Sequence, residues 1–190
     1  VRGTTLLERV GTDVKIRDQD GDGLAEVVVG VYRGEVATGL NEGLVRVYDG
    51  GTIAGSPWGF DATSEDPERT IEGPSSQARF GQAVAVIDDA NGDGVRDLLG
   101  LAGFDSANGI QAGGLYYVSG AGSSALRPLE IPGVASGHQV GRGIGLQDMD
   151  GDGVLDLVAG APGAGTDQDG ANTGRVFVYA GSGPGFESSP

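Results

Sequence analysis

A short acidic stretch that occurs three times constrains the fold of this chain more than any other feature. Each copy begins with aspartate, has oxygen-bearing side chains at positions 1, 3, 5 and 9, and has glycine at position 6. Alternate positions of a tight turn converge on one point, and glycine permits the sharp bend. The pattern therefore predicts a repeat protein with three cation-binding loops. The copies cover residues 18–30, 89–100 and 148–160.

Two further markers accompany each loop. A Val-Gly or Phe-Gly pair precedes the loop, and its glycine lies 7 or 8 residues ahead of the first aspartate. A glycine that opens an apolar, aromatic run follows 25 or 26 residues after that aspartate. Because the markers keep their order, the chain is predicted to be a single array with approximate units 1–74, 75–134 and 135–190. The pairs are Val10-Gly11, Phe80-Gly81 and Val140-Gly141, and the later glycines are Gly43, Gly114 and Gly174.

Apolar runs on both sides of each loop indicate β-strands, and no stretch of useful length has helical periodicity. Four antiparallel strands in a unit of about 60 residues are typical of a β-propeller blade. We therefore expect an all-β fold of three four-stranded antiparallel blades, forming a partial or half propeller. The third blade lacks a convincing fourth strand, because residues 186–190 are few and polar. Residues 4–8 are a candidate for that outer strand, in this chain or in a neighbouring copy.

The loops have the chemistry of calcium sites. Calcium takes six to eight oxygen ligands, which carboxylates, amides and a backbone carbonyl at position 7 would supply. An EF-hand is excluded, because its bidentate glutamate at position 12 is replaced by Val29, Gly100 and Ala159. The predicted ligands are Asp18, Asp20, Asp22, Leu24 and Glu26; Asp89, Asn91, Asp93, Val95 and Asp97; and Asp148, Asp150, Asp152, Val154 and Asp156.

Two alternatives to three calcium sites remain open. Aspartate and glycine are common in turns without metal, but three or four crowded carboxylates are costly without a cation. Another hard cation could take the place of calcium. The second loop carries one charge fewer because of Asn91, so it is expected to bind most weakly.

Composition limits the partners of the chain. The 190 residues include 38 glycines, no cysteine, and a net charge of −15. Such an acidic surface disfavours nucleic acid and anionic membranes and favours cations or basic ligands. No apolar run approaches the roughly 18 residues of a membrane span, so membrane insertion is not expected. The chain starts with Val1 and shows no signal peptide, which suggests a mature or excised piece of a longer precursor.

The quoted motifs resemble a known family. Phe80-Gly81, the second loop, and Gly160-Ala161-Pro162 are similar to the FG-GAP repeat of integrin α-subunit propellers. The resemblance implies a calcium-bearing propeller in a secreted or cell-surface protein that recognises a protein or glycan ligand. Propellers of this family usually have seven blades. Three blades leave two blade faces exposed, so either further blades complete the ring or two copies form a homodimer.

Two classes of function follow from these observations. The preferred hypothesis is a non-enzymatic, extracellular module for adhesion or ligand recognition, with structural calcium in each blade. The alternative is an accessory or catalytic domain of a secreted glycan-active enzyme, which would need paired carboxylates about 5–9.5 Å apart. Catalysis by the single histidine, His138, is not expected, because no nucleophile motif accompanies it. Carboxylates outside the loops that are available for such a pair include Asp61, Asp66, Asp105 and Asp167, but the sequence cannot show that any two converge.

Overall fold

The computed structural model describes residues 8–35, 40–55, 67–129, 135–165, 173–182 and 185–186. Nearly all regular structure in these ranges is β. The first sheet contains β1 (Val10–Arg17), β2 (Glu26–Val31), β3 (Leu44–Tyr48) and β4 (Arg69–Glu72). The second contains β5 (Phe80–Val86), β6 (Leu98–Ala102), β7 (Gly114–Val118) and β8 (Arg127–Leu129). The third contains β9 (Ile144–Gln147), β10 (Asp156–Ala161) and β11 (Arg175–Tyr179).

Two small elements complete the described structure. Helix α1 (Gly50–Ala54) follows β3, and the side chain of Asp49 caps it by accepting a hydrogen bond of 2.6 Å from the N–H of Thr52. A two-stranded sheet of β12 (Gly181–Ser182) and β13 (Gly185–Phe186) follows β11. In the described part of the chain α1 is the one helix, and its five residues are far fewer than the roughly 20 of a membrane span.

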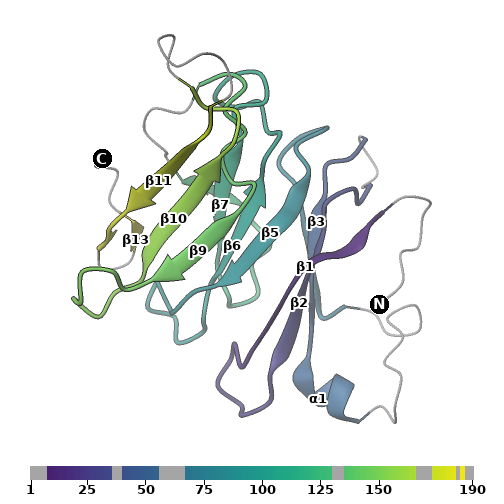
Figure 1. Cartoon of the computed structure of the whole chain (residues 1–190). Coiled ribbons are helices and arrows are strands. Elements are labelled where there is room, and N and C mark those ends of the chain that lie inside the picture. Colours follow the sequence, from purple (N-terminus) through teal and green to yellow (C-terminus); the bar gives the residue numbers. More distant parts are fainter. Residues whose placement is uncertain are drawn as a thin grey trace.

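The three main sheets are antiparallel, have their strands in chain order, and stand side by side (Figure 1). This arrangement confirms the all-β prediction and is consistent with blades of a partial propeller. The first two sheets have the predicted four strands. The described residues give the third sheet three strands, in agreement with the polar sequence after β11. The suggested outer strand at residues 4–8 lies, except for Glu8, outside the described residues.

Apolar side chains fill both spaces between neighbouring sheets. One buried cluster joins the first and second sheets and includes Val28, Val45, Phe80 and Val84. A second cluster joins the second and third sheets and includes Leu99. The middle sheet is therefore covered on both faces, as a blade within a stack must be.

The packing around Phe80 explains why only one unit has the Phe-Gly pair. Phe80 is fully buried, and a Cβ atom on Gly100 would lie 2.3 Å from its ring. In the other two sheets, the residue equivalent to Phe80 is smaller and the residue equivalent to Gly100 is larger. In the first sheet these are Val10 and Val29, which pack in one cluster, and in the third they are Val140 and Ala159. The pairs of the first and second sheets therefore have nearly the same side-chain volume, whereas the pair of the third sheet is smaller.

A glycine before the third strand forms the joint between consecutive sheets. Gly43 makes a parallel bridge to Phe80, and Gly113 makes the same bridge to Val140. Both have positive φ, and a Cβ atom would lie 2.1 Å from the Phe80 oxygen at Gly43 and 2.2 Å from the Val140 oxygen at Gly113. The repeat pattern predicted that Gly114 is the equivalent of Gly43, and this prediction is wrong by one residue. The strand register decides in favour of Gly113, because Gly114 and Leu44 both lie within strands.

Candidate metal loops

Each predicted loop is the turn between the first two strands of its sheet. Strands, not helices, flank all three, in agreement with the exclusion of an EF-hand. The glycine at position 6 has a φ of 90°, 90° or 89° in the three loops, a conformation that other residues rarely adopt. These glycines are Gly23, Gly94 and Gly153.

The aspartate at position 1 organises its own loop in the same way in all three copies. In the first loop, Asp18 accepts hydrogen bonds from the N–H groups of Gly21 at 2.7 Å and Gly23 at 3.2 Å. Asp20 accepts from the N–H of Asp22 at 3.0 Å, and Asp22 from that of Leu24 at 2.7 Å. The second and third loops repeat all four bonds. Each of these side-chain oxygens, including the amide oxygen of Asn91, is thereby held in place with lone pairs left for a cation.

Carboxylate oxygens converge in two of the loops. Oxygens of Asp18, Asp20 and Asp22 lie within 4.8 Å of one another in the first. In the third loop the corresponding group is Asp148, Asp150 and Asp156, so the carboxylate of position 9 joins it. Three ionised carboxylates this close repel one another, and a divalent cation removes that cost. The residues of these loops fit calcium.

The second loop satisfies its oxygens differently. The side-chain amide of Asn91 donates hydrogen bonds to Asp93 at 2.8 Å and to the hydroxyl of Ser119 at 3.0 Å. The hydroxyl of Ser119 donates to Asp93 at 2.9 Å. Hydrogen bonds to the N–H of Val95 and to Asn91 lower the pKa of Asp93. Ser119 lies 28 residues from Asn91, and the loop spacing gave no signal for it.

The acidic residue at position 9 anchors each loop to the sheet. Asp156 accepts hydrogen bonds from the N–H groups of Met149 at 2.7 Å and Gly181 at 2.8 Å. Asp97 accepts the equivalent bonds from Ala90 and Gly120. The bond from Gly181, followed by that from Met149, lowers the pKa of Asp156. In the second and third loops the carboxylate at position 9 therefore links the loop, the second strand and the end of the third strand.

Glu26 occupies this position in the first loop and leaves one oxygen free. Its Oε2 accepts from the N–H of Gln19 at 2.5 Å, as the aspartates do with their own loops. Its Oε1 is buried and has no hydrogen-bond partner. A buried carboxylate oxygen without a partner is costly, and a cation would satisfy it. Glu26, already a predicted ligand of the first loop, therefore has one oxygen available for a cation.

Acidification in the presence of a calcium chelator is expected to destabilise the fold through Asp156. Folding lowers its pKa below the ordinary value of 3.8. The group therefore contributes stability above pH 3.8, and this contribution is lost as the pH falls through the folded-state pKa. Asp156→Asn should be less stable than the wild type near pH 7, and the difference should shrink towards pH 3. Thermal unfolding across this pH range measures it, and a difference that does not vary with pH would contradict the assignment.

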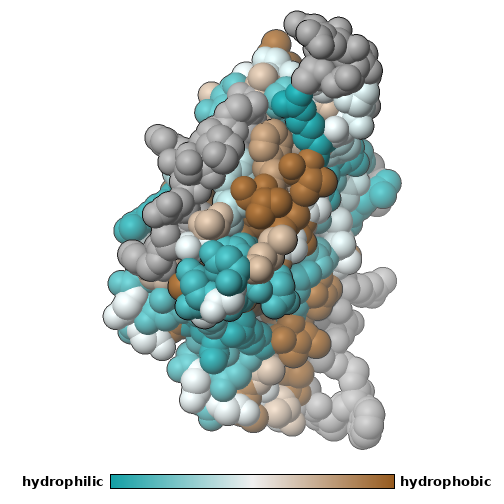
Figure 2. Space-filling view, turned by 60° about the vertical axis from the view of Figure 1, so that its left-hand side comes forward, coloured by the Kyte–Doolittle hydropathy of each residue, from teal (hydrophilic) through white to brown (hydrophobic). Residues whose placement is uncertain are grey.

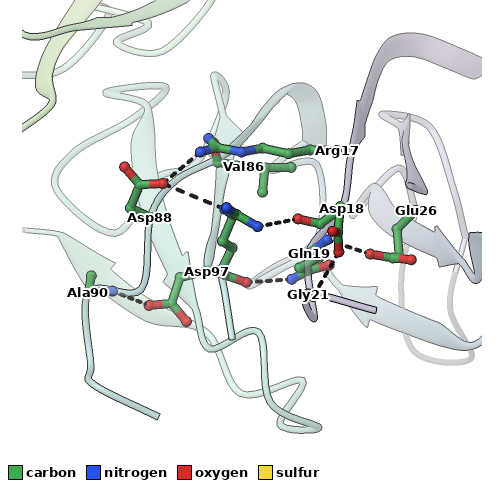
Figure 3. A network of polar contacts seen from close by, with 10 residues as sticks. Arg17, Asp18, Gln19, Gly21, Glu26, Val86, Asp88, Ala90 and Asp97 are labelled. Carbon is green, nitrogen blue, oxygen red and sulfur yellow. Dashed lines mark hydrogen bonds and ion pairs between the residues drawn. The ribbon is translucent and has the colours of Figure 1, made fainter. Parts of the chain in front are cut away.

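Side chains also join the first loop to the second (Figure 3). Arg96, next to Asp97, donates a hydrogen bond of 2.5 Å to the carbonyl oxygen of Asp18. The Gln19 amide donates to the Arg96 carbonyl at 2.7 Å, and Arg17 pairs with Asp88 at 2.6 Å. Position 1 of one loop is thus tied to position 8 of the next.

The carboxylates considered for catalysis give no pair in the described residues. Asp105 is buried and accepts hydrogen bonds from the hydroxyls of Tyr116 at 2.5 Å and Ser75 at 3.0 Å. Asp61, Asp66 and Asp167 lie outside the described residues. His138 accepts a hydrogen bond of 3.2 Å from the N–H of Ala135, within its own loop.

Comparison with known proteins agrees with this geometry. The family model of the FG-GAP repeat matches residues 140–179, which contain the third loop and its three strands. The chain carries an FG-GAP repeat. The two preceding sheets have the same loop, strand order and joint, although the family match itself covers the third unit.

The FG-GAP chain is also similar to integrin α subunits. It is 33% identical to integrin alpha-PS5 of Drosophila melanogaster over 168 residues, which are 85% of this chain and 16% of that protein. Integrin alpha-IIb of Mus musculus is 29% identical over 86% of this chain and 16% of its own length. Integrin alpha-6 of Gallus gallus is 31% identical over 65% of this chain and 11% of its own length. The chain thus spans a small part of these relatives.

Proposed function

We propose that this chain is a calcium-binding FG-GAP propeller module that recognises a protein or glycan ligand outside the cell, without catalysis. Calcium is structural in this proposal and occupies one loop in each of three blades, 1–74, 75–134 and 135–190. The convergence of three carboxylates in the first and third loops carries the proposal. The similarity to integrin α subunits supports the adhesive role and the extracellular site.

The calcium affinity expected of such a module fits an extracellular location. Extracellular calcium modules bind with dissociation constants of about 10⁻⁴–10⁻³ M, so their loops fill outside cells and empty in the cytosol. Three bound ions would also change the net charge from −15 to about −9.

Calcium is expected to bind with a stoichiometry of three and to raise the unfolding temperature. A site contributes about 2.7 kcal/mol when free calcium is 100-fold above its dissociation constant. Asp20→Ala, Asp93→Ala and Asp152→Ala should each remove one site. Asp93→Ala should cost the least calcium-dependent stability, because Asn91 already makes the second loop the weakest. Calorimetric titration and thermal unfolding, with calcium and with chelator, measure both quantities.

Asp88→Ala is the matched control, because it removes the same charge beside the second loop from an exposed residue that is not a predicted ligand. It should retain all three sites. A parallel titration with magnesium tests the identity of the cation, since magnesium demands stricter octahedral geometry. Unchanged stoichiometry in the three loop variants would refute the proposal.

A further inference from the structure

Four arginines lie at the end of the sheets opposite the metal loops. Each metal loop joins the first two strands of its sheet, so the start of the first strand and the end of the second strand lie at the opposite end. Arg9 precedes β1, Arg33 follows β2, and Arg79 precedes β5. Arg142 precedes β9, and we call these four residues the arginine end. In Figure 1 the metal loops lie at the lower end of the sheets and the arginine end lies at the upper end.

Two of these arginines share the ring of Phe104. The guanidinium carbon of Arg79 lies 3.9 Å from the centre of this ring, and that of Arg142 lies 5.5 Å from it. The electrons of an aromatic ring attract a cation at such distances. The three residues come from three connections along the chain, before β5, after β6 and before β9. Only the stacking of the sheets therefore brings them together.

The first sheet has a similar arrangement around Tyr32. The guanidinium carbons of Arg9 and Arg33 lie 6.0 Å and 5.8 Å from the centre of its ring. Arg9 and Arg79 are equivalent residues, because each precedes the Val-Gly or Phe-Gly pair and has positive φ, at 55° and 59°. Two successive sheets thus present a pair of arginines on one aromatic side chain at the same end.

The four arginines have no carboxylate partner among the residues that the structure describes. Within the same residues, the buried Nε of Arg79 has no hydrogen-bond partner, and the guanidinium of Arg142 donates only to the side-chain oxygen of Gln139, at 3.1 Å. The exposed acids Glu35 and Glu72 lie at this end but form no ion pair with the arginines. The positive charge of the arginine end is therefore not compensated within the described chain. The ion pairs found there belong to Lys15, Arg17, Arg46 and Arg96.

Exposed apolar side chains do not distinguish this end from the rest of the surface. Figure 2 turns the third sheet forward and shows apolar side chains gathered on that sheet, whose Val176 and Val178 are 68% and 49% exposed. At the arginine end, Leu40 and Ile110 are 60% and 76% exposed, but they come from separate connections, between β2 and β3 and between β6 and β7. Charge is therefore the feature that sets the arginine end apart in a chain with a net charge of −15.

We propose that the arginine end binds an acidic peptide segment, whose carboxylates pair with Arg79 and Arg142 and with Arg9 and Arg33. The inference rests on the proposed function and gives the chemical class of its ligand. A planar guanidinium matches a carboxylate with two parallel hydrogen bonds. The ring of Phe104 holds a guanidinium at 3.9 Å, so it offers little surface on which a sugar could stack, and a peptide is favoured over a glycan.

A labelled hexaglutamate peptide tests the site in the full chain with saturating calcium, by fluorescence anisotropy. Overall repulsion by the acidic chain opposes binding of this probe, so binding requires a local positive site. Arg142→Glu should weaken it by about tenfold or more, because a charge-assisted hydrogen bond is replaced by repulsion. Arg142→Lys should lose less, because it keeps the charge without the planar fork. Arg142 is exposed, so both variants should fold, and added salt should weaken binding to the wild type.

Arg127→Glu is the matched control. Arg127 is an exposed arginine at the start of β8, at the metal-loop end of the second sheet, and its substitution changes the charge by the same amount. This variant should bind hexaglutamate like the wild type. Asp20→Ala, which removes a predicted calcium ligand, should also keep hexaglutamate binding, because the peptide does not bind through calcium in the first loop.

Three results would overturn the inference: no binding of hexaglutamate to the wild type, an unchanged affinity in Arg142→Glu, or equal losses in Arg142→Glu and Arg127→Glu. A heparin hexasaccharide that binds more tightly than hexaglutamate, with the same dependence on Arg142, would overturn the choice of a peptide. Calcium titration of the same samples separates this inference from the proposed function. Three bound calcium ions without hexaglutamate binding would contradict the arginine site alone.

Discussion

Phe80→Val is expected to destabilise the chain strongly, and a second substitution, Gly100→Val, should restore part of the loss. Removing most of a fully buried ring leaves a cavity, and Phe→Ala changes of this kind cost about 3–5 kcal/mol. Phe80 also makes an edge-to-face contact with Tyr116 at a centroid distance of 6.1 Å. Valine retains some contacts, so the single variant should lie near the lower end of that range.

The matched change at Gly100 makes this a double-mutant cycle. Gly100→Val alone places its Cβ atom 2.3 Å from the Phe80 ring, and overpacking costs about 1–3 kcal/mol. The double variant reproduces the pairing of Val10 with Val29 in the first sheet. It should therefore be more stable than the sum of the single changes predicts. Denaturant unfolding of the four proteins measures the coupling, and additive effects would contradict the volume exchange.

Gly113→Ala is expected to have the second large effect. The substitution combines positive φ, which costs roughly 1–2 kcal/mol, with a Cβ atom 2.2 Å from the Val140 oxygen. Because the clash is with backbone, relief requires the second and third sheets to move apart. The free energy of unfolding should fall by about 3 kcal/mol or more, from the sum of the conformational and overpacking costs.

Gly174→Ala provides a control with a similar φ of 79°, because among the described residues its Cβ atom would approach no atom closer than 3.7 Å. It should lose only the conformational part, roughly 1–2 kcal/mol. Both variants should be compared at the same protein and calcium concentrations, because bound calcium also contributes to the measured stability. Equal losses for the two variants would show that the joint tolerates a methyl group and would contradict the close approach.

The metal loops were predictable because their geometry is local. A tight turn with glycine at position 6 brings positions 1, 3 and 5 together whatever the rest of the chain does. The hydrogen bonds around Asp18 and Asp148 join residues no more than five positions apart. The repeat of this turn, and the strands on either side of it, also follow from short-range pattern, which explains why the all-β class was correct.

Other features of the site depend on distant partners, and no spacing could reveal them. Asn91 meets Ser119, and Arg96 meets the Asp18 carbonyl 78 residues away. The free Oε1 of Glu26 reflects how the extra methylene places its carboxylate against the sheet, because the aspartates at the same position receive a second N–H. Only the packed fold fixes such distances.

The sequence by itself determined the loops, their order and the strand-rich units, because turn geometry and side-chain alternation act over a few residues. The tertiary structure decided which face of each sheet packs on its neighbour. It also showed that Gly113, and not the predicted Gly114, forms the joint to the third sheet. It also decided that Val176 and Ile16 are exposed while Val45 and Val86 are buried. All four residues look alike as members of apolar strands. Val45 and Val86 are buried because the first and second sheets pack on each other, whereas Val176 and Ile16 lie on faces that point away from this packing.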